Sequence, residues 1–275
     1  MPASNVPPLV PREGWHVIHL FYQIDHAQWS ILGDDEKRAA KTRLTELVQE
    51  IRATKDTHLL TFSIATPKAD LGFMLLTPDL QVANAYEKQL TLSLGPEILS
   101  PTYSYLSQTE SSEYTTSSEQ YAAETLVGEK GLTPGSPEFD QAKKEFDDRM
   151  AHYLQHRLYP VLPDWPVVCF YPMSKRRSGE DNWYSLSYEA RRELMAGHAR
   201  VGRTYSGRIL QLITGSTGLD EHEWGVTLLS KTTTDIKDIV YEMRFDEVSA
   251  RYAEFGDFYI CLQLPLNELF KRLCL

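Results

Sequence analysis

The stretch V-V-C-F-Y-P-M-S-K at residues 167–175 begins the series of elements that decides the fold. Its branched and aromatic residues predict a β-strand over residues 167–173. Side chains two positions apart share one face of a strand. Tyr171, Met173 and Lys175 are therefore expected on one face, with Lys175 on or just past the end of the strand.

The order strand, helix, strand, strand, helix, strand follows from this stretch. The six predicted elements occupy residues 167–173, 187–203, 208–213, 224–229, 234–245 and 258–264. The same order occurs earlier, at residues 15–24, 34–53, 58–65, 71–77, 78–94 and 103–109. Such a β-α-β-β-α-β unit is the ferredoxin-like module. The pattern predicts an α+β protein with two ferredoxin-like domains, whose antiparallel sheets face each other and carry helices outside.

A different segment separates the two halves. Residues 110–159 contain Ser and Thr clusters, the breaker run T-P-G-S-P at residues 133–137, and a charged helical pattern over about residues 138–154. We therefore expect an N-terminal domain over residues 1–110, a helical connector over 111–160 and a C-terminal domain over 161–275.

Composition limits the class of protein. The 275 residues carry a formal net charge of -10, with 42% apolar and 24% charged residues. An acidic, soluble chain of this kind is not expected to bind nucleic acid, which requires clustered Lys and Arg. The three cysteines have no metal-ligand spacing. The sequence shows neither a signal peptide nor an apolar run long enough to span a bilayer, so we expect a cytoplasmic protein without membrane association.

One histidine stands out in the first predicted helix of the C-terminal half, over residues 187–203, which Ser187 is expected to cap. His198 shares a helical face with Leu194 and Val201, so its ring is expected to point toward the core. A buried histidine bonded to a backbone carbonyl is one interpretation. An axial ligand to haem iron is the other, because no further His, Cys or carboxylate stands at zinc-ligand spacing.

Other polar residues, in the C-terminal half and at the end of the connector, also have two interpretations. Tyr171 and Lys175 suggest a site where a phenol reacts beside a basic group, but a core tyrosine and a solvent-facing lysine fit the pattern as well. Gln211 lies in the apolar strand I-L-Q-L-I, where an amide needs a partner or a ligand. Further donors suited to carboxylates, or to ordinary ion pairs, are Arg157, Tyr159, Arg244 and Ser249.

Several motifs, in order over about 120 residues, resemble the chlorite dismutase-like superfamily of haem proteins, and within it the coproheme decarboxylases. They are Y-P-M-S-K-R-R (171–177), N-W-Y (182–184), G-H-A-R-V-G-R-T-Y-S-G (197–207), Q-L-I-T-G-S-T-G-L-D (211–220), E-W-G-V-T-L (223–228) and Y-E-M-R-F-D-E-V-S-A-R-Y (241–252). In the first half the match is thinner, and residues 110–154 match poorly.

The resemblance implies a barrel-like pair of ferredoxin-like domains, haem in the second domain and a homopentamer. His198 matches the iron ligand. Gln211 matches the position on the other side of the haem, where chlorite dismutases carry an arginine. Tyr171 matches the tyrosine that becomes a radical, and Lys175 the basic residue beside the second reactive propionate. Met173 matches a residue close to the macrocycle. The positions that match propionate-binding residues are Arg157, Tyr159, Arg244 and Ser249.

The implied reaction consumes hydrogen peroxide and converts two propionates of Fe-coproporphyrin III (coproheme) to vinyl groups, giving haem b. This is the last step of coproporphyrin-dependent haem biosynthesis, and a transient contact with a coproporphyrin ferrochelatase is a further implied partnership. Two alternatives differ in kind. A non-catalytic haem-binding or delivery protein would not need Tyr171. A chlorite dismutase or peroxidase-like haem enzyme would need neither the neutral Gln211 nor the carboxylate-binding residues.

Overall fold

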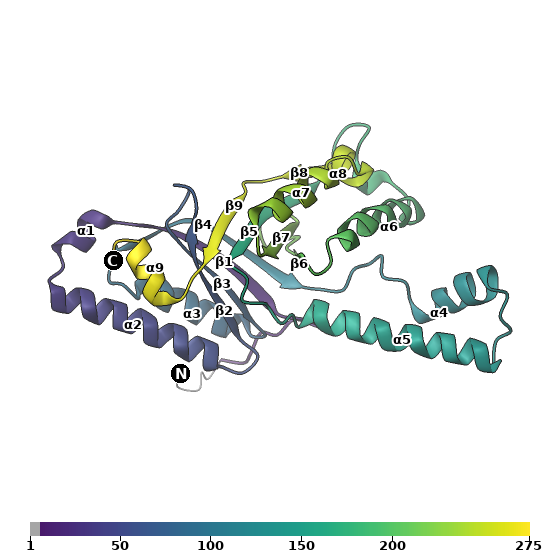
Figure 1. The fold of residues 1–275 in the computed structure, drawn as a ribbon, viewed down its shortest axis with the longest axis horizontal. Helices are drawn as coiled ribbons and strands as arrows, with labels where there is room; N and C mark the ends of the chain where they lie inside the picture. Colours follow the sequence, from purple (N-terminus) through teal and green to yellow (C-terminus); the bar gives the residue numbers. More distant parts are fainter. Residues whose placement is uncertain (1–5) are drawn as a thin grey trace. The chain divides into compact units, whose positions relative to one another are not determined.

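The computed structural model describes residues 6–275 (Figure 1). The strands in this range are β1 (His16–Ile24), β2 (His58–Ile64), β3 (Leu71–Thr77), β4 (Leu99–Thr109), β5 (Val167–Lys175), β6 (Ile209–Gly215), β7 (Trp224–Ser230), β8 (Ala253–Phe255) and β9 (Tyr259–Gln263). The α+β fold class predicted from the sequence is confirmed.

Helices alternate with these strands. They are α1 (His26–Ile31), α2 (Asp34–Ala53), α3 (Leu80–Leu92), α4 (Ser118–Gln120), the π-helix η1 (Tyr121–Glu129), α5 (Pro137–Leu158), the 3₁₀-helix η2 (Trp183–Ser185), α6 (Tyr188–Thr204), α7 (Thr233–Met243), α8 (Glu247–Tyr252) and α9 (Leu266–Arg272). In the part of the chain that is described, no helix is both long and apolar enough to cross a membrane.

The strands form one antiparallel sheet in the order β7-β6-β4-β1-β3-β2-β9-β5-β8, with β7 also paired to β5. The N-terminal half contributes the order β4-β1-β3-β2 and the C-terminal half the order β9-β5-β7-β6. When the four strands of each half are numbered along the chain, with the short β8 left out, they lie in the order fourth, first, third, second. This is the order expected of two copies of one ferredoxin-like module.

The two half-sheets are the two sides of one barrel and not separate layers, which confirms the barrel-like pair of domains that the resemblance implied. They join edge to edge through two short ladders, at Gln108↔Gly215 in β4–β6 and at Phe62↔Gln263 in β2–β9. Pairing both edges closes the half-sheets into a barrel, and β8 lies beside the barrel, paired with β5. Hydropathy patterns specify the faces of a strand but not its neighbour across half the chain.

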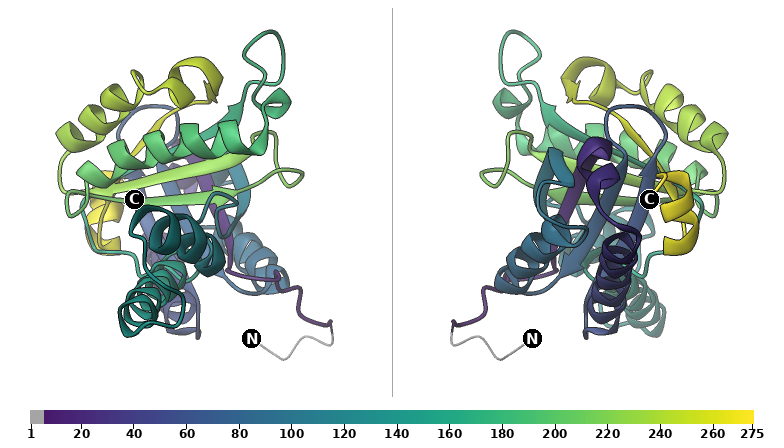
Figure 2. Two further views of the ribbon diagram at one scale, coloured as in Figure 1. Left: turned by 90° about the vertical axis from the view of Figure 1, so that its right-hand side faces the viewer. Right: turned by 90° about the vertical axis from the view of Figure 1, so that its left-hand side faces the viewer.

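The helices cover the outside of this barrel. Figure 1 and Figure 2 show α2 and α3 against the N-terminal strands and α7 against the C-terminal strands, on opposite sides of the barrel. The face of α2 that carries Leu44, Val48 and Ile51 is fully buried. Ser187, expected to cap the helix that carries His198, accepts a hydrogen bond from the Ala190 backbone amide, which confirms that prediction.

Aromatic side chains fill the barrel interior. The Phe21 and Tyr259 rings stack with centroids 4.3 Å apart, and the Phe170 ring stacks on the His19 imidazole at 3.9 Å. The His19 Nε2 lies 2.9 Å from the Thr227 hydroxyl. Desolvation by burial lowers the pKa of His19 to about 3, so the imidazole is neutral in the folded protein at neutral pH.

His19 is expected to make folding sensitive to acid. Between pH 6.5 and 3 the unfolded chain protonates His19 whereas the folded chain does not. The contribution of the neutral His19 to the free energy of unfolding is therefore complete above pH 6.5 and is lost as the pH falls toward 3. The loss between pH 6.5 and pH 4.5 should be roughly 2 kcal/mol. Urea unfolding at the two pH values should show a smaller pH dependence for His19→Gln than for the wild type, and equal dependence would contradict a neutral buried His19.

Two compact units share the described residues. The first contains the residues up to Thr109 together with Pro163–Leu275, and the second is Glu110–Leu162. Within the second unit, Ser136 caps α5 and Pro137 occupies its first turn. The Tyr121 ring stacks on Phe146 with centroids 4.0 Å apart, which joins η1 to α5. The division into three domains at residues 110 and 160 stays a prediction.

Candidate functional site

The outer face of β5, β7 and β6 presents several of the predicted site residues. Tyr171 of β5 pairs with Val226 of β7, which in turn pairs with Ile213 of β6. One row further along, Leu228 of β7 pairs with Cys169 and with Gln211. Because alternate residues of a strand share a face, the sheet presents its Tyr171 row and its Gln211 row to the same side.

Tyr171 is almost completely buried on this face. It is 8% exposed, and its ring stacks on Phe258 with centroids 4.3 Å apart. Burial raises the pKa of the Tyr171 phenol above its ordinary value. The hydroxyl therefore keeps its proton at neutral pH and can give up a hydrogen atom.

Lys175 is buried at the end of the same strand, which corrects the alternative of a solvent-facing lysine. Its backbone amide donates to the Glu223 carboxylate at 2.7 Å, and its Nζ lies 4.6 Å from the centre of the Trp183 ring. Desolvation by burial lowers the pKa of Lys175 to about 8, against the opposing charges of Asp246 and Glu223. An amine of this kind can both pair with a carboxylate and exchange a proton near neutral pH.

His198 is held by a carboxylate and not by the backbone carbonyl that the sequence allowed as an alternative. Its Nδ1 lies 2.7 Å from Oδ2 of Asp246. Asp246 also caps α8, where its Oδ2 accepts a hydrogen bond from the Ser249 backbone amide. A carboxylate on Nδ1 fixes the imidazole tautomer and leaves Nε2 with a lone pair, which is the usual arrangement of a metal-ligating histidine.

Gln211 contacts the helix that carries His198. Its Nε2 donates to the Gly202 carbonyl at 3.1 Å. A Cβ atom added at Gly202 would lie 3.2 Å from this nitrogen, so the Gln211 amide would have to shift slightly to admit a larger residue there. Gly202 follows His198 by four residues, which places the two on one face of α6. Gln211 therefore bonds to the helix that carries His198, one turn beyond that residue. The sequence did not predict this contact.

The remaining predicted residues divide between the two units. Arg244 lies with its guanidinium carbon 4.0 Å from the centre of the Phe255 ring, and the backbone of Ser249 bonds to the aspartate that holds His198. Arg157 and Tyr159 end α5 in the second unit, where the Arg157 Nε donates to the Glu110 carbonyl. The part that Arg157 and Tyr159 play in the site stays a prediction.

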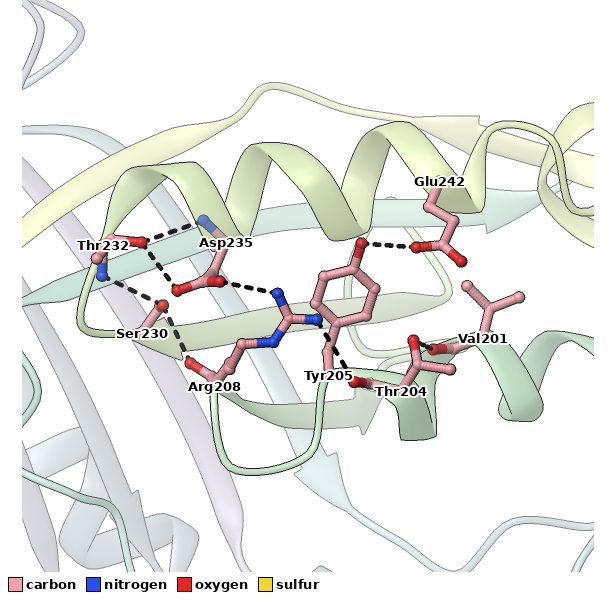
Figure 3. Close-up of polar contacts among 8 residues, drawn as sticks. All are labelled: Val201, Thr204, Tyr205, Arg208, Ser230, Thr232, Asp235 and Glu242. Carbon is pink, nitrogen blue, oxygen red and sulfur yellow. Dashed lines mark hydrogen bonds and ion pairs between the residues drawn. The ribbon is translucent and has the colours of Figure 1, made fainter.

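The end of α6 is fastened to α7 by polar contacts (Figure 3). The Tyr205 hydroxyl donates to the Glu242 carboxylate at 2.6 Å. The guanidinium carbon of Arg208 lies 4.4 Å from the centre of the Tyr205 ring, and its Nη1 lies 3.2 Å from Oδ1 of Asp235. These contacts fix the C-terminal end of the helix on which His198 stands.

The residues present fit haem. Although α6 has the apolar spacing of a packed helix, none of its 17 residues is fully buried, whereas α7 buries Ile236 and Ile239. Partly buried side chains such as Met173, Ile213 and Phe255 border the same apolar cluster. Among residues 6–275 no three His, Cys, Asp or Glu side chains gather to hold a metal by themselves. Haem requires a single protein ligand and apolar surface for its ring, which is what His198 and these side chains offer.

Two residues of this site were not singled out from the sequence. Asp246 lies within F-D-E-V-S-A-R, where an aspartate before a short helical pattern is a capping signal, but that signal does not indicate a contact with His198. Trp183 lies in the N-W-Y motif, and only the folded chain shows its ring beside Lys175.

Comparisons with known proteins identify the family of the chain. The family model described as chlorite dismutase matches residues 37–264. A heme-binding protein from Thermus thermophilus is 37% identical, with 99% of this chain and 100% of that chain covered and a TM-score of 0.78. The chlorite dismutase from Candidatus Nitrospira defluvii in complex with imidazole is 17% identical, with coverages of 96% and 97% and a TM-score of 0.69, and this likeness shows the fold alone. The chain belongs to the chlorite dismutase family of proteins.

Proposed function

We propose that this protein is a peroxide-dependent coproheme decarboxylase, which forms haem b from Fe-coproporphyrin III. The observation that carries the proposal is the placement of Tyr171 and Lys175, both buried, four residues apart on β5. A protein that only binds haem needs apolar surface and a ligand such as His198, but it has no use for a buried phenol and a buried amine on one strand face.

The reaction balances with one peroxide per propionate. Each propionate loses a hydrogen from its β-carbon and its carboxylate as carbon dioxide, leaving a vinyl group. The two electrons released reduce hydrogen peroxide, so that propionate, peroxide and one proton give vinyl, carbon dioxide and two waters. The porphyrin iron with peroxide supplies the oxidising power, and the protein supplies positions and charges.

Tyr171 would remove the hydrogen atom from the substrate. Its buried phenol holds a proton and lies against Phe258, and a one-electron oxidation of the ring would make it the acceptor of the β-hydrogen. Lys175 would pair with the carboxylate that leaves. With a pKa of about 8, the lysine can be charged while it holds the carboxylate and can also deliver the proton that the balance requires.

His198 would be the iron ligand, with Asp246 strengthening it as a donor. The neutral Gln211 would face the peroxide side, where an arginine would instead favour an anion such as chlorite. The residues proposed to hold the porphyrin and its propionates are Arg157, Tyr159, Met173, Arg244 and Ser249. We also propose a homopentamer in the cytoplasm and a transient contact with a coproporphyrin ferrochelatase.

A haem-binding or delivery protein is the second candidate, because the 37% identical protein from Thermus thermophilus is described as heme-binding. A peroxide titration of the chain loaded with Fe-coproporphyrin III separates the two. Stepwise loss of two carbon dioxide molecules per porphyrin, through a three-propionate species to haem b, is the expected result by chromatography and mass spectrometry. Binding without conversion, or bleaching alone, would favour the carrier.

A further inference from the structure

Two histidines of the second unit stand side by side on α5. His152 and His156 are four residues apart, and their ring centroids are 4.3 Å apart with planes at 75°. Both side chains are exposed. Among residues 6–275 neither imidazole has a hydrogen-bond or ion-pair partner, and each ring contacts no aromatic ring except the other. The two imidazoles therefore make no polar contact with the rest of the described chain that would explain their position.

Histidines at this spacing on one helical face form a bidentate site for a transition metal. A metal–nitrogen bond is about 2.0–2.1 Å, so two nitrogens on adjacent coordination positions lie roughly 3 Å apart. Rings with centroids 4.3 Å apart can reach that separation by small rotations of exposed side chains. The backbone of α5 already provides the closeness that a bidentate ligand needs.

Charges around the pair do not oppose a cation strongly. The two histidines lie in the last turns of α5, where the helix dipole favours positive charge. Asp148, one turn before His152, offsets the neighbouring Arg149. Arg157 follows His156 directly, but its guanidinium Nε donates to the Glu110 carbonyl.

We propose that His152 and His156 bind a divalent transition-metal ion, with water completing its coordination. Imidazole ligands suit Cu²⁺, Ni²⁺ and Zn²⁺, whereas Mg²⁺ and Ca²⁺ take oxygen ligands. Affinity rises from Mn²⁺ through Ni²⁺ to Cu²⁺ at such a site. The site belongs to the second unit and binds its metal whether or not the chain decarboxylates a porphyrin.

Isothermal titration of the full, untagged chain with Ni²⁺ tests the site. The wild type should bind one ion per chain with an affinity that His152→Gln and His156→Gln each lower at least tenfold. Both positions are exposed, so far-UV circular dichroism should be unchanged. Titrations with Mn²⁺ and Cu²⁺ should give weaker and tighter binding, respectively.

A matched variant tests whether Ni²⁺ binding depends on the His152–His156 pair or only on the number of histidines in the chain. Gln89 is exposed on α3, and Ala85 and Ser93 stand four residues away on either side. The double variant Gln89→His/His156→Gln keeps 8 histidines without a pair and should bind Ni²⁺ as weakly as His156→Gln alone. Wild-type affinity in either single variant, or in the double variant, would overturn the assignment to His152 and His156.

Discussion

The Tyr171→Phe variant should bind Fe-coproporphyrin III within a few-fold of the wild-type affinity and form three-propionate product roughly 10³-fold more slowly, or not at all. Only the hydroxyl is removed, so the ring can still stack on Phe258 and the apolar face of β5 is preserved. The proposed chemistry depends on the hydrogen that this hydroxyl gives up and takes back. Losing a group that acts directly in the chemical step commonly costs this much in rate.

The measurement is a single-turnover reaction with peroxide, quenched and analysed by chromatography, beside a fluorescence titration of porphyrin binding. Tyr86→Phe is the matched control, because Tyr86 is also buried in the first unit but its hydroxyl bonds to Thr54, on the N-terminal helices. The control should retain the wild-type rate. A fully active Tyr171→Phe variant would assign the hydrogen transfer to another residue.

The sequence predicted the elements around the site because these depend on local patterns. The alternation in β5 predicted Tyr171 and Lys175 on one strand face. In the structure β5 includes both residues, and their separation of four positions puts them on the same face. Ser187 was expected before the helix that carries His198, and it caps that helix. Periodicity and caps are properties of neighbouring residues, so one chain suffices to read them.

Contacts between distant segments could not be predicted in this way. The ladder between β2 and β9 joins Phe62 to Gln263, far apart in the chain, and no turn or spacing specifies it. The bond from Asp246 to His198 likewise depends on how α8 packs beside α6. Gln211 was expected to need a partner because its strand is apolar, but its side chain is exposed, and its bond to the Gly202 carbonyl is set by the distance between a helix and a strand.

Lys175 shows where a local pattern misleads. A lysine at the end of a strand usually extends its ammonium into water. Here the loop after β5 returns Trp183 over the Nζ atom, and Trp183 packs in turn on Tyr252 of α8. The burial that lowers the pKa of Lys175 therefore comes from residues outside its own strand.

His198→Ala should have the second large effect, on iron coordination. Without the imidazole, bound haem loses its proposed protein ligand, and we expect a changed visible spectrum and affinity lowered by at least tenfold. Asp246→Asn is the finer variant, since asparagine also caps helices well and should preserve α8. It removes the negative charge from the His198 Nδ1 side, which makes Nε2 a weaker donor.

The two variants should therefore differ in kind. His198→Ala should lose the iron–histidine stretching band in the resonance Raman spectrum of the reduced haem complex, whereas Asp246→Asn should keep that band at a lower frequency. Asp235→Asn is the control, because Asp235 pairs with Arg208 on the same side of the barrel but does not bond to His198. An unchanged spectrum in His198→Ala would mean that another residue binds the iron. An unchanged band in Asp246→Asn would contradict a charged carboxylate bonded to His198 Nδ1 in the haem complex, because such a partner must alter the electron density at Nε2.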